Sequence, residues 1–342
     1  MKILVTGGVG FIGTNVCLEA RSRNHEVVAF DNLVRPLTEE NITVLKEAGV
    51  IIVRGDIRNA EDFQKFPWVP DGIVHLGGQC GIPYAHVNPI YDFEVNLRGT
   101  LNVLEYSRTH GKIPVAFASS NKTYSDITDE MFPHHETEKR YVWDDIEALD
   151  ENIPLDAFGK HGRSLYGTSK ASGDLYMQEY YQAFGVPTVI NRMSCIYGLY
   201  QKGVEDQAWV DWFIRKIAYG DGKLNIFGTG KQVRDMLWGG DVAKLYVSEI
   251  EGLVNGTLTP GQPFNIGGGK EFTMSLLEAI ECIEDVTNKK AELNFTDKRH
   301  GDQDIWISDI TKITSALDWK PEVSPQEGIR MIVEQYNKDL IS

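Results

Sequence analysis

The sequence MKILVTGGVGFIGTNV, residues 1–16, joins a short apolar run to four closely spaced glycines and the start of a helical stretch. Residues 2–6 predict a buried strand, and residues 14–23 predict a helix. Glycines between a strand and a helix let the backbone turn sharply and approach a pyrophosphate, whose charge is stabilised by amide groups at the helix N-terminus. The residues of this turn that we expect to contact a dinucleotide are Gly7, Gly10, Phe11, Ile12 and Gly13.

A second apolar run, residues 26–30, follows the helix and ends at Asp31. A carboxylate at this point can accept hydrogen bonds from both hydroxyls of an adenosine ribose, and it repels a 2′-phosphate. The pattern therefore predicts NAD rather than NADP, while the nearby Arg35 is a feature against that choice. An ordinary tight turn without a ligand is the alternative interpretation of the glycines.

The alternation of apolar runs and helical stretches continues along the chain, with residues 91–109 as one long helical stretch. The further apolar runs are residues 50–53, 72–76, 114–118 and 186–191. This order predicts an α/β fold with a doubly wound parallel sheet, and the chain length favours two lobes. Ligands bind outside the carboxyl ends of such strands, where Asp56, the turn 76–79 and residues 119–124 would lie.

Composition restricts the partners of the chain. The formal net charge of −15 opposes the phosphate-rich surfaces of nucleic acids and membranes, so we expect neither as a partner. The first apolar run is too short for a signal peptide and no later run is long enough for a membrane span, so we expect a cytoplasmic protein.

Cysteine and histidine spacing gives no indication of a metal site. The four cysteines, which we interpret as reduced packing residues, are Cys17, Cys80, Cys195 and Cys282. The eight histidines include His134 and His135 in an acidic segment, but they show no ligand spacing. We therefore predict no metal.

Tyr166 and Lys170 lie four residues apart at the start of the predicted helix 166–184, so their side chains share one helix face. A nearby ammonium and a positive nicotinamide ring would favour the phenolate form of the tyrosine, which could then exchange a proton with a sugar hydroxyl. Ser120, at the end of a preceding strand, would hydrogen-bond the same sugar oxygen. A surface pair is the usual interpretation of an isolated YxxxK, but here it follows the dinucleotide turn, the acid and the serine in order.

The motifs TGGVGFIG and YGTSK, with Asp31, Ser120 and NLRGT around Asn96, resemble the extended short-chain dehydrogenase/reductase family of nucleotide-sugar enzymes over essentially the whole chain. The resemblance implies a Rossmann-type NAD-binding domain and a smaller C-terminal lobe that binds a nucleotide-diphosphate sugar. We place these at residues 1–190 and 191–342, with part of 233–258 returning to the first domain. It also implies a homodimer or homotetramer.

The resemblance assigns catalysis to Ser120, Tyr166 and Lys170. Besides Tyr166, Lys170, Asp31 and the glycine turn, the expected cofactor contacts are Asn32, Asp56, Ile57, Leu76, Gly77, Gln79, Asn96 and Ser119.

The residues after Ser120 limit the types of reaction that the site could catalyse. Dehydratases of the family carry an Asp-Glu pair there, whereas this chain has Asn121 and Lys122, which cannot replace a carboxylate base. Cysteine, the extra acid or base of family members that abstract a proton beside a ketone, is absent from residues 119–125. Epimerisation remains: a hydride leaves the sugar for NAD and returns to the opposite face.

The segments SSNKTYSD, ETEKRY, DQAWVDWF and GTGKQVRD resemble a narrower group, the CDP-tyvelose 2-epimerases, also called CDP-paratose 2-epimerases. This resemblance implies oxidation and reduction at C2 of a CDP-linked sugar. The expected substrate contacts are Asn121, Gln207, Arg234 and Arg299, of which the arginines suit a pyrophosphate. A UDP-glucose 4-epimerase, a 2-epimerase of another CDP- or GDP-hexose, and a non-catalytic NAD-binding sensor are the alternatives.

Two regions allow two interpretations each. The acidic segment 126–162 is either a lid over the sugar, which we favour, or a plain excursion. Trp209 has Trp212 and Phe213 at helical spacing and is interpreted as a core residue rather than a ligand contact.

Overall fold

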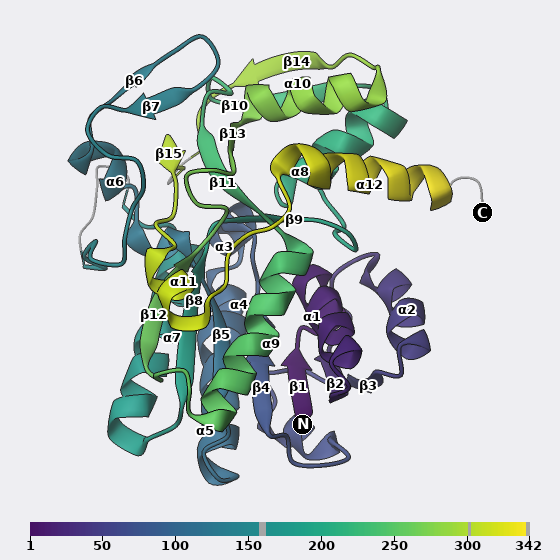
Figure 1. The fold of residues 1–342 in the computed structure, drawn as a ribbon, viewed down its shortest axis with the longest axis vertical. Coiled ribbons are helices and arrows are strands. Elements are labelled where there is room, and N and C mark those ends of the chain that lie inside the picture. Colours follow the sequence, from purple (N-terminus) through teal and green to yellow (C-terminus); the bar gives the residue numbers. More distant parts are fainter. Residues whose placement is uncertain (157–161, 300–301, 340–342) are drawn as a thin grey trace.

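The computed structural model describes residues 1–156, 162–299 and 302–339, and its centre is a seven-stranded sheet (Figure 1). The strand order is β12-β8-β5-β4-β1-β2-β3, and every pairing in it is parallel. The strands are β1 (Lys2–Thr6), β2 (Glu26–Asp31), β3 (Ile51–Arg54), β4 (Gly72–His75), β5 (Val115–Ser120), β8 (Thr188–Met193) and β12 (Gln262–Ile266). The predicted doubly wound parallel sheet is confirmed, with predicted strand ends displaced by at most two residues.

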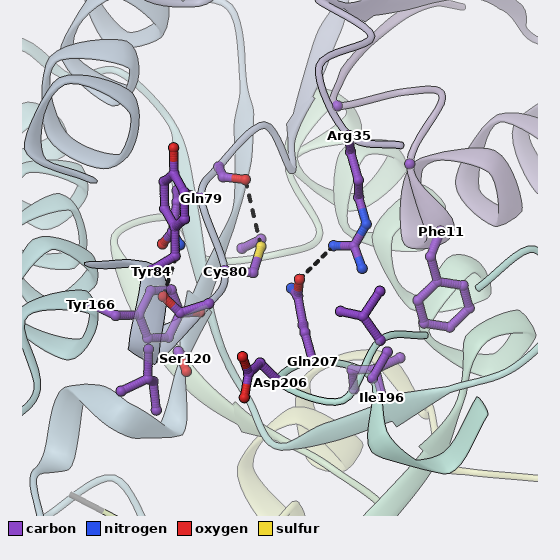
Figure 2. Close-up of a pocket in the computed structure, with 18 of the residues that line it drawn as sticks. Phe11, Arg35, Gln79, Cys80, Tyr84, Ser120, Tyr166, Ile196, Asp206 and Gln207 are labelled. Carbon is purple, nitrogen blue, oxygen red and sulfur yellow. Dashed lines mark hydrogen bonds between the residues drawn. The ribbon is translucent and has the colours of Figure 1, made fainter. Parts of the chain in front are cut away.

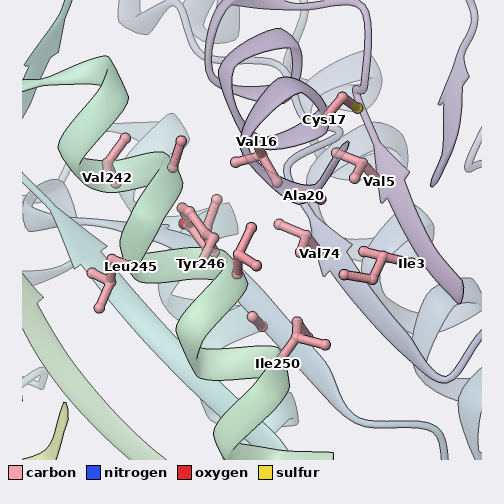
Figure 3. Close-up of a cluster of buried hydrophobic side chains, with 14 of the residues drawn as sticks. Ile3, Val5, Val16, Cys17, Ala20, Val74, Val242, Leu245, Tyr246 and Ile250 are labelled. Atoms are coloured by element: carbon pink, nitrogen blue, oxygen red, sulfur yellow. The ribbon is translucent and has the colours of Figure 1, made fainter. Parts of the chain in front are cut away.

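Helices cover both faces of this sheet, because alternate residues of each buried strand point to opposite faces. On one face, Ile3 and Val5 of β1 pack with Val16 of α1 (Phe11–Ser22) and Ile250 of α9 (Gly239–Asn255) (Figure 3). On the other face, Leu4 lies in a cluster with residues of α5 (Gly99–Thr109) and α7 (Leu165–Phe184). The two apolar layers hold the carboxyl ends of the strands in place.

The predicted helix 91–109 consists of three parts. These are α4 (Pro89–Phe93), a π-helical turn (Glu94–Arg98) and α5. Such π-turns insert an extra residue into a helix and occur frequently at functional sites. The turn contains Asn96, the polar residue of the NLRGT motif.

A second lobe lies above the carboxyl edge of the sheet in Figure 1. Its strand β11 pairs with β9, β13 and β15, while β10 pairs with β14. The strands are β9 (Cys195–Tyr197), β10 (Lys223–Phe227), β11 (Val233–Trp238), β13 (Thr273–Ser275), β14 (Glu292–Thr296) and β15 (Ile305–Trp306). The helices are α8 (Trp209–Ile214), a π-turn (Arg215–Tyr219), α10 (Leu276–Thr287) and α12 (Pro325–Asp339).

The chain leaves this lobe and returns to the sheet. Helix α9 packs on α1, and β12 extends the sheet beyond β8. Strand β12 lies outside the stretch 233–258 that we expected to return. The division at residue 190 remains a prediction.

The acidic segment 126–162 has regular structure in its described part. It contains α6 (Ile127–Met131) and the antiparallel hairpin of β6 (His134–Glu136) and β7 (Tyr141–Trp143). Trp143 packs in a cluster with Trp306 of the second lobe. None of its described residues lines the large cavity, so the preference for a lid is not supported; residues 157–161 lie outside the described chain.

The remaining short helices connect these elements. They are α2 (Asn41–Glu47), α3 (Ile82–Val87), α11 (Thr311–Leu317) and the 3₁₀ turns Thr38–Glu40, Ala60–Lys65 and Asn121–Tyr124. In the described ranges, no helix has the length and apolar character that crossing a membrane requires.

Candidate active site

A cavity of about 1390 Å³ lies between the carboxyl edge of the sheet and the second lobe. Figure 2 shows side chains from both parts pointing into it, including Phe11, Ser120 and Tyr166 from the first and Gln207 from the second. Of all predicted site residues, only Asn96 does not line it. The volume exceeds that of common single-ligand pockets, so the cavity has room for two ligands side by side.

The glycine turn lies at the sheet end of the cavity. Gly7 has a φ of +66°, and a Cβ there would approach the backbone nitrogen of Gly77 to 2.9 Å. A Cβ on Gly13 would lie 2.1 Å from the carbonyl oxygen of Gly7. The bare backbone therefore brings helix α1 close to β1, as binding of a pyrophosphate at a helix N-terminus requires. This turn fits a dinucleotide.

Asp31 lies at the end of β2, and its carboxylate accepts hydrogen bonds from the backbone nitrogens of Val9, at 3.1 Å, and Leu33, at 2.9 Å. Burial raises the pKa of Asp31, and these amide hydrogen bonds oppose that effect. Arg35 points away from the acid: its Nη1 donates to Oε1 of Gln207 at 2.8 Å across the cavity. The arginine that seemed to oppose NAD thus contacts the second lobe.

Asp56 and Asn32 meet beside Asp31. The Nδ2 of Asn32 donates to Asp56 at 3.0 Å, and Arg58 pairs with the same carboxylate at 2.7 Å. The Arg58 hydrogen bond lowers the pKa of Asp56 to about 2. Asp56 is therefore ionised at neutral pH, and its backbone neighbour Ile57 lines the cavity.

Ser120, Tyr166 and Lys170 come together where β5 ends against the start of α7. The helix begins one residue before Tyr166, and the side chain of Ser164 caps it by accepting from the nitrogen of Gly167 at 3.1 Å. The side chains of Ser120 and Tyr166 lie next to each other, and Ser120 opposes the rise in the pKa of the phenol. The Nζ of Lys170 donates to the carbonyl oxygen of Ala118 at 2.9 Å. The predicted trio is thus assembled on two rigid elements.

Without a bound ligand, the surroundings of Tyr166 do not favour the phenolate form that we expected. Burial raises the pKa of its phenol strongly, the neighbouring Cys80 adds to this, and Ser120 opposes it. Burial also lowers the pKa of Lys170. The ammonium of Lys170 is directed to the carbonyl oxygen of Ala118 rather than to the phenol. A positive charge on a bound ligand would add to that of Lys170 in stabilising the phenolate.

Asn96 supports the cavity from behind. Its Oδ1 accepts from the nitrogen of Gln79 at 2.8 Å, and its Nδ2 donates to the carbonyl oxygen of the same residue at 3.0 Å and to Ser169 at 3.0 Å. This pattern fixes the turn 76–79 against α7. Asn96 therefore positions the turn 76–79, and its expected contact with the cofactor stays a prediction.

The two predicted phosphate-binding arginines are both ion-paired. Arg234 donates to Asp302 at 2.7 Å, and Lys122 pairs with the same carboxylate at 3.1 Å. Burial would raise the pKa of Asp302, but the two cations outweigh it and lower that pKa. Arg299 pairs with Asp206 at 2.9 Å. Asp302 and Asp206 both line the cavity, and the sequence analysis identified neither.

Asn121, the remaining predicted substrate contact, is buried beside Ser120. Its Oδ1 accepts from the hydroxyl of Ser120 at 3.4 Å, and its Nδ2 donates to Gln303 at 3.4 Å. It thus lies between the tyrosine site and the Asp302 loop.

The packing interpretation was wrong for Cys80 and incomplete for Cys195 and Trp209. Cys80 is exposed and its thiol lines the cavity close to Tyr166 and Tyr84 (Figure 2), whereas Cys17 is buried as expected. Cys195 and Trp209 also line the cavity, although the Trp209 ring packs on Phe213 as well. Cys80 directly follows the predicted turn 76–79, and this position could have indicated that its thiol lines the cavity. All four cysteines are free.

His134 and His135 pair with carboxylates of the second lobe and of their own hairpin region. His135 lies 2.6 Å from Asp144, and His134 lies 3.4 Å from Asp304. Within the residues that the structure describes, no three His, Cys, Asp or Glu side chains are grouped to hold a metal ion.

Known proteins share these features. A sequence model of the NAD dependent epimerase/dehydratase family matches residues 3–267. The chain is 38% identical to CDP-paratose 2-epimerase of Salmonella typhi, over 98% of each protein.

Two solved structures have the same fold. The UDP-glucose 4-epimerase of Thermotoga maritima with UDP-glucose has a TM-score of 0.81 at 25% identity, covering 99% of this chain and 100% of that one. The UDP-glucose 4-epimerase of Thermus thermophilus in complex with NAD has a TM-score of 0.78 at 28% identity, covering 98% and 99%. The predicted resemblance to NAD-dependent nucleotide-sugar epimerases is confirmed.

Proposed function

Because the chain belongs to the NAD-dependent epimerase/dehydratase family, we propose that it is an NAD-dependent epimerase of the CDP-paratose (CDP-tyvelose) 2-epimerase type. One observation carries the proposal: a single cavity joins the glycine turn, the Ser120–Tyr166–Lys170 trio and the paired arginines of the second lobe. The 38% identity over 98% of the chain supports C2 as the reacting carbon and CDP as the activating nucleotide.

The residues proposed to hold NAD are those of the sheet end of the cavity. They are Gly7, Gly10, Phe11, Ile12, Gly13, Asp31, Asn32, Asp56, Ile57, Leu76, Gly77, Gln79, Ser119, Tyr166 and Lys170. Asp31 would accept hydrogen bonds from the adenosine ribose in place of water. When bound, NAD supplies a reversible acceptor for a sugar hydride.

The chain's own residues would move and hold the proton. The Tyr166 phenolate accepts the proton of the C2 hydroxyl and later returns it to the C2 oxygen. Ser120, within hydrogen-bonding reach of Tyr166, orients the sugar oxygen. Lys170 is anchored on the carbonyl of Ala118 and contributes positive charge beside the same site. No external reductant is needed, since the hydride that leaves C2 is returned to the same carbon.

The keto sugar has to turn over without leaving the cavity, so the nucleotide must anchor it. Arg234 and Arg299 would bind the pyrophosphate, with Gln207 and Asn121 lining the path between base and sugar. Lys122 is held by Asp302 and cannot act as a carboxylate base. This arrangement favours epimerisation over dehydration.

We further propose a cytoplasmic homodimer or homotetramer, with a Rossmann domain over residues 1–190 and the substrate lobe mainly over 191–342. The alternatives are a C4 epimerase like the UDP-glucose 4-epimerases of the same fold, a 2-epimerase of another CDP- or GDP-hexose, and a non-catalytic NAD-binding sensor. They make different predictions for isotopically labelled substrates.

The test uses CDP-linked 3,6-dideoxyhexose and UDP-glucose, each deuterated separately at C2 and C4. We expect turnover of the CDP-sugar, slowed only by deuterium at C2. Slower turnover with deuterium at C4 of UDP-glucose would assign a 4-epimerase, and absence of turnover with both sugars would contradict the proposal.

A further inference from the structure

Strand β10 separates the core of the second lobe from the cavity. Leu224 and Ile226 are buried in the core of the lobe, whereas Asn225 and Phe227 point the other way and line the cavity. The cavity face of this strand therefore presents one amide and one aromatic ring next to each other.

The amide of Asn225 is fixed in one orientation. Its Nδ2 donates to Oε1 of Glu205 at 2.6 Å, and its Oδ1 accepts from Asn294, which lies directly opposite on β14, at 2.9 Å. Glu205 is exposed, and among the described residues no hydrogen bond involves its second carboxylate oxygen. Glu205 itself lines the cavity, so a directed acceptor is offered to a ligand.

A flat surface lies beside this acceptor. The guanidinium of Arg299 lies 3.8 Å from the centroid of the Phe227 ring and is held there by Asp206. Aromatic rings and guanidinium planes are the surfaces on which proteins stack nucleobases, whose edges are then read by hydrogen bonds. Stacking surface and acceptor together form a site for the edge of a base.

We propose that Glu205, oriented by Asn225, selects the nucleobase of the substrate by accepting a hydrogen bond from an exocyclic amine. The 4-amino group of cytosine is such a donor, whereas uracil presents an acceptor oxygen at that position and would face the carboxylate unpaired. The proposal rests on the proposed function, because it presumes a nucleotide-linked sugar in this cavity. Cytosine is favoured among the amino bases by the CDP in the name of the Salmonella typhi relative.

The experiment measures dissociation constants of CDP and UDP for the NAD-loaded full chain and for Glu205→Gln. The amide keeps an oxygen for Asn225 and can offer an N–H to the O4 of uracil. We expect the wild type to bind CDP at least about tenfold more tightly than UDP, and the variant to lose that ratio through weaker CDP and tighter UDP binding. Asp206→Asn is the matched control, since it removes the same charge one residue away but should weaken both nucleotides equally.

An unchanged CDP:UDP ratio in Glu205→Gln, or equal affinities in the wild type, would overturn the base-selecting role. Either result leaves epimerisation at C2 standing, because that reaction is tested by deuterium at C2 rather than by the base. A ratio lost equally in Asp206→Asn would also overturn it, by showing that charge alone is responsible.

Discussion

At the sheet end of the cavity, around the glycine turn and Tyr166, backbone groups hold Asp31 and Lys170, whereas at the second-lobe end carboxylate side chains hold the two arginines. Asp31 is fixed by two backbone amides from neighbouring turns. In the second lobe, Arg234 and Arg299 are each held by a carboxylate from another segment. We infer that the sheet end is a rigid binding site for a cofactor that stays bound. At the second-lobe end, the arginines would exchange their internal ion pairs for contacts with a substrate that binds and dissociates in each turnover.

The largest expected effect tests the sheet end. Tyr166→Phe removes the proton-transferring hydroxyl, so turnover should fall by about 10²- to 10⁴-fold while bound NAD and the melting temperature stay unchanged. Turnover and the NAD released on denaturation are measured together. Tyr176→Phe, on the exposed side of the same helix, is the control. Full activity of Tyr166→Phe would contradict the catalytic assignment and support another proton carrier.

Gly13→Ala tests whether the close backbone approach is needed for the cofactor. A Cβ 2.1 Å from the Gly7 carbonyl must displace α1 from β1, so we expect loss of retained NAD and a stability cost of about 1–3 kcal/mol. Gly10→Ala is the matched change, because its Cβ would meet only the Gly7 carbonyl oxygen, at 3.2 Å. Equal melting temperatures for the two variants, measured without added NAD, would show that the turn tolerates a side chain.

Arg234→Lys tests the second-lobe end. Lysine keeps the charge but loses the planar fork, so we expect KM to rise about tenfold with NAD content unchanged. Steady-state kinetics give KM and kcat separately. Arg98 forms an exposed ion pair outside the cavity, so Arg98→Lys is the control. Loss of bound NAD from Arg234→Lys would contradict the assignment of NAD to the sheet end and of the substrate to the second-lobe end.

Glu249→Gln tests the framework beneath both ends. Glu249 of α9 is fully buried, its Oε2 accepts from Asn191 at 2.7 Å, and burial raises its pKa to about 8. Between its ordinary pKa of 4.5 and about 8, the folded chain keeps a proton that the unfolded chain loses, so the stability contributed by this group falls as pH rises.

The melting temperature of Glu249→Gln minus that of the wild type should therefore increase by a few degrees from pH 5 to pH 8, with turnover little changed. Glu26→Gln, at an exposed position, should show no such trend. A difference between Glu249→Gln and the wild type that does not vary with pH would show that Glu249 is ionised in the folded chain.

The sequence predicted the sheet end better than the second-lobe end, for a physical reason. Strand β1 has the predicted bounds, and Ser120, Tyr166 and Lys170 meet because parallel strands end at one edge. Asp302 and Glu205 were missed because their partners, Arg234 and Asn225, come from distant segments that only tertiary folding brings together.

Local conformation accounts for the other differences. The NLRGT motif was interpreted from the family pattern, and the structure places its Asn96 in a π-turn that the sequence did not predict, hydrogen-bonded to the turn 76–79. The hairpin of β6 and β7 has only three residues in each strand, too few for an alternating pattern to be visible in the sequence.

The central claim is that the hydride taken from C2 returns to the same carbon. The direct measurement is mass spectrometry of both epimers after incubating the C2-deuterated CDP-sugar with the NAD-loaded protein in ordinary water. We predict that the product epimer retains the deuterium. Loss of the label to water would contradict hydride return and would indicate proton abstraction instead, for which the Cys80 thiol lies in the same cavity.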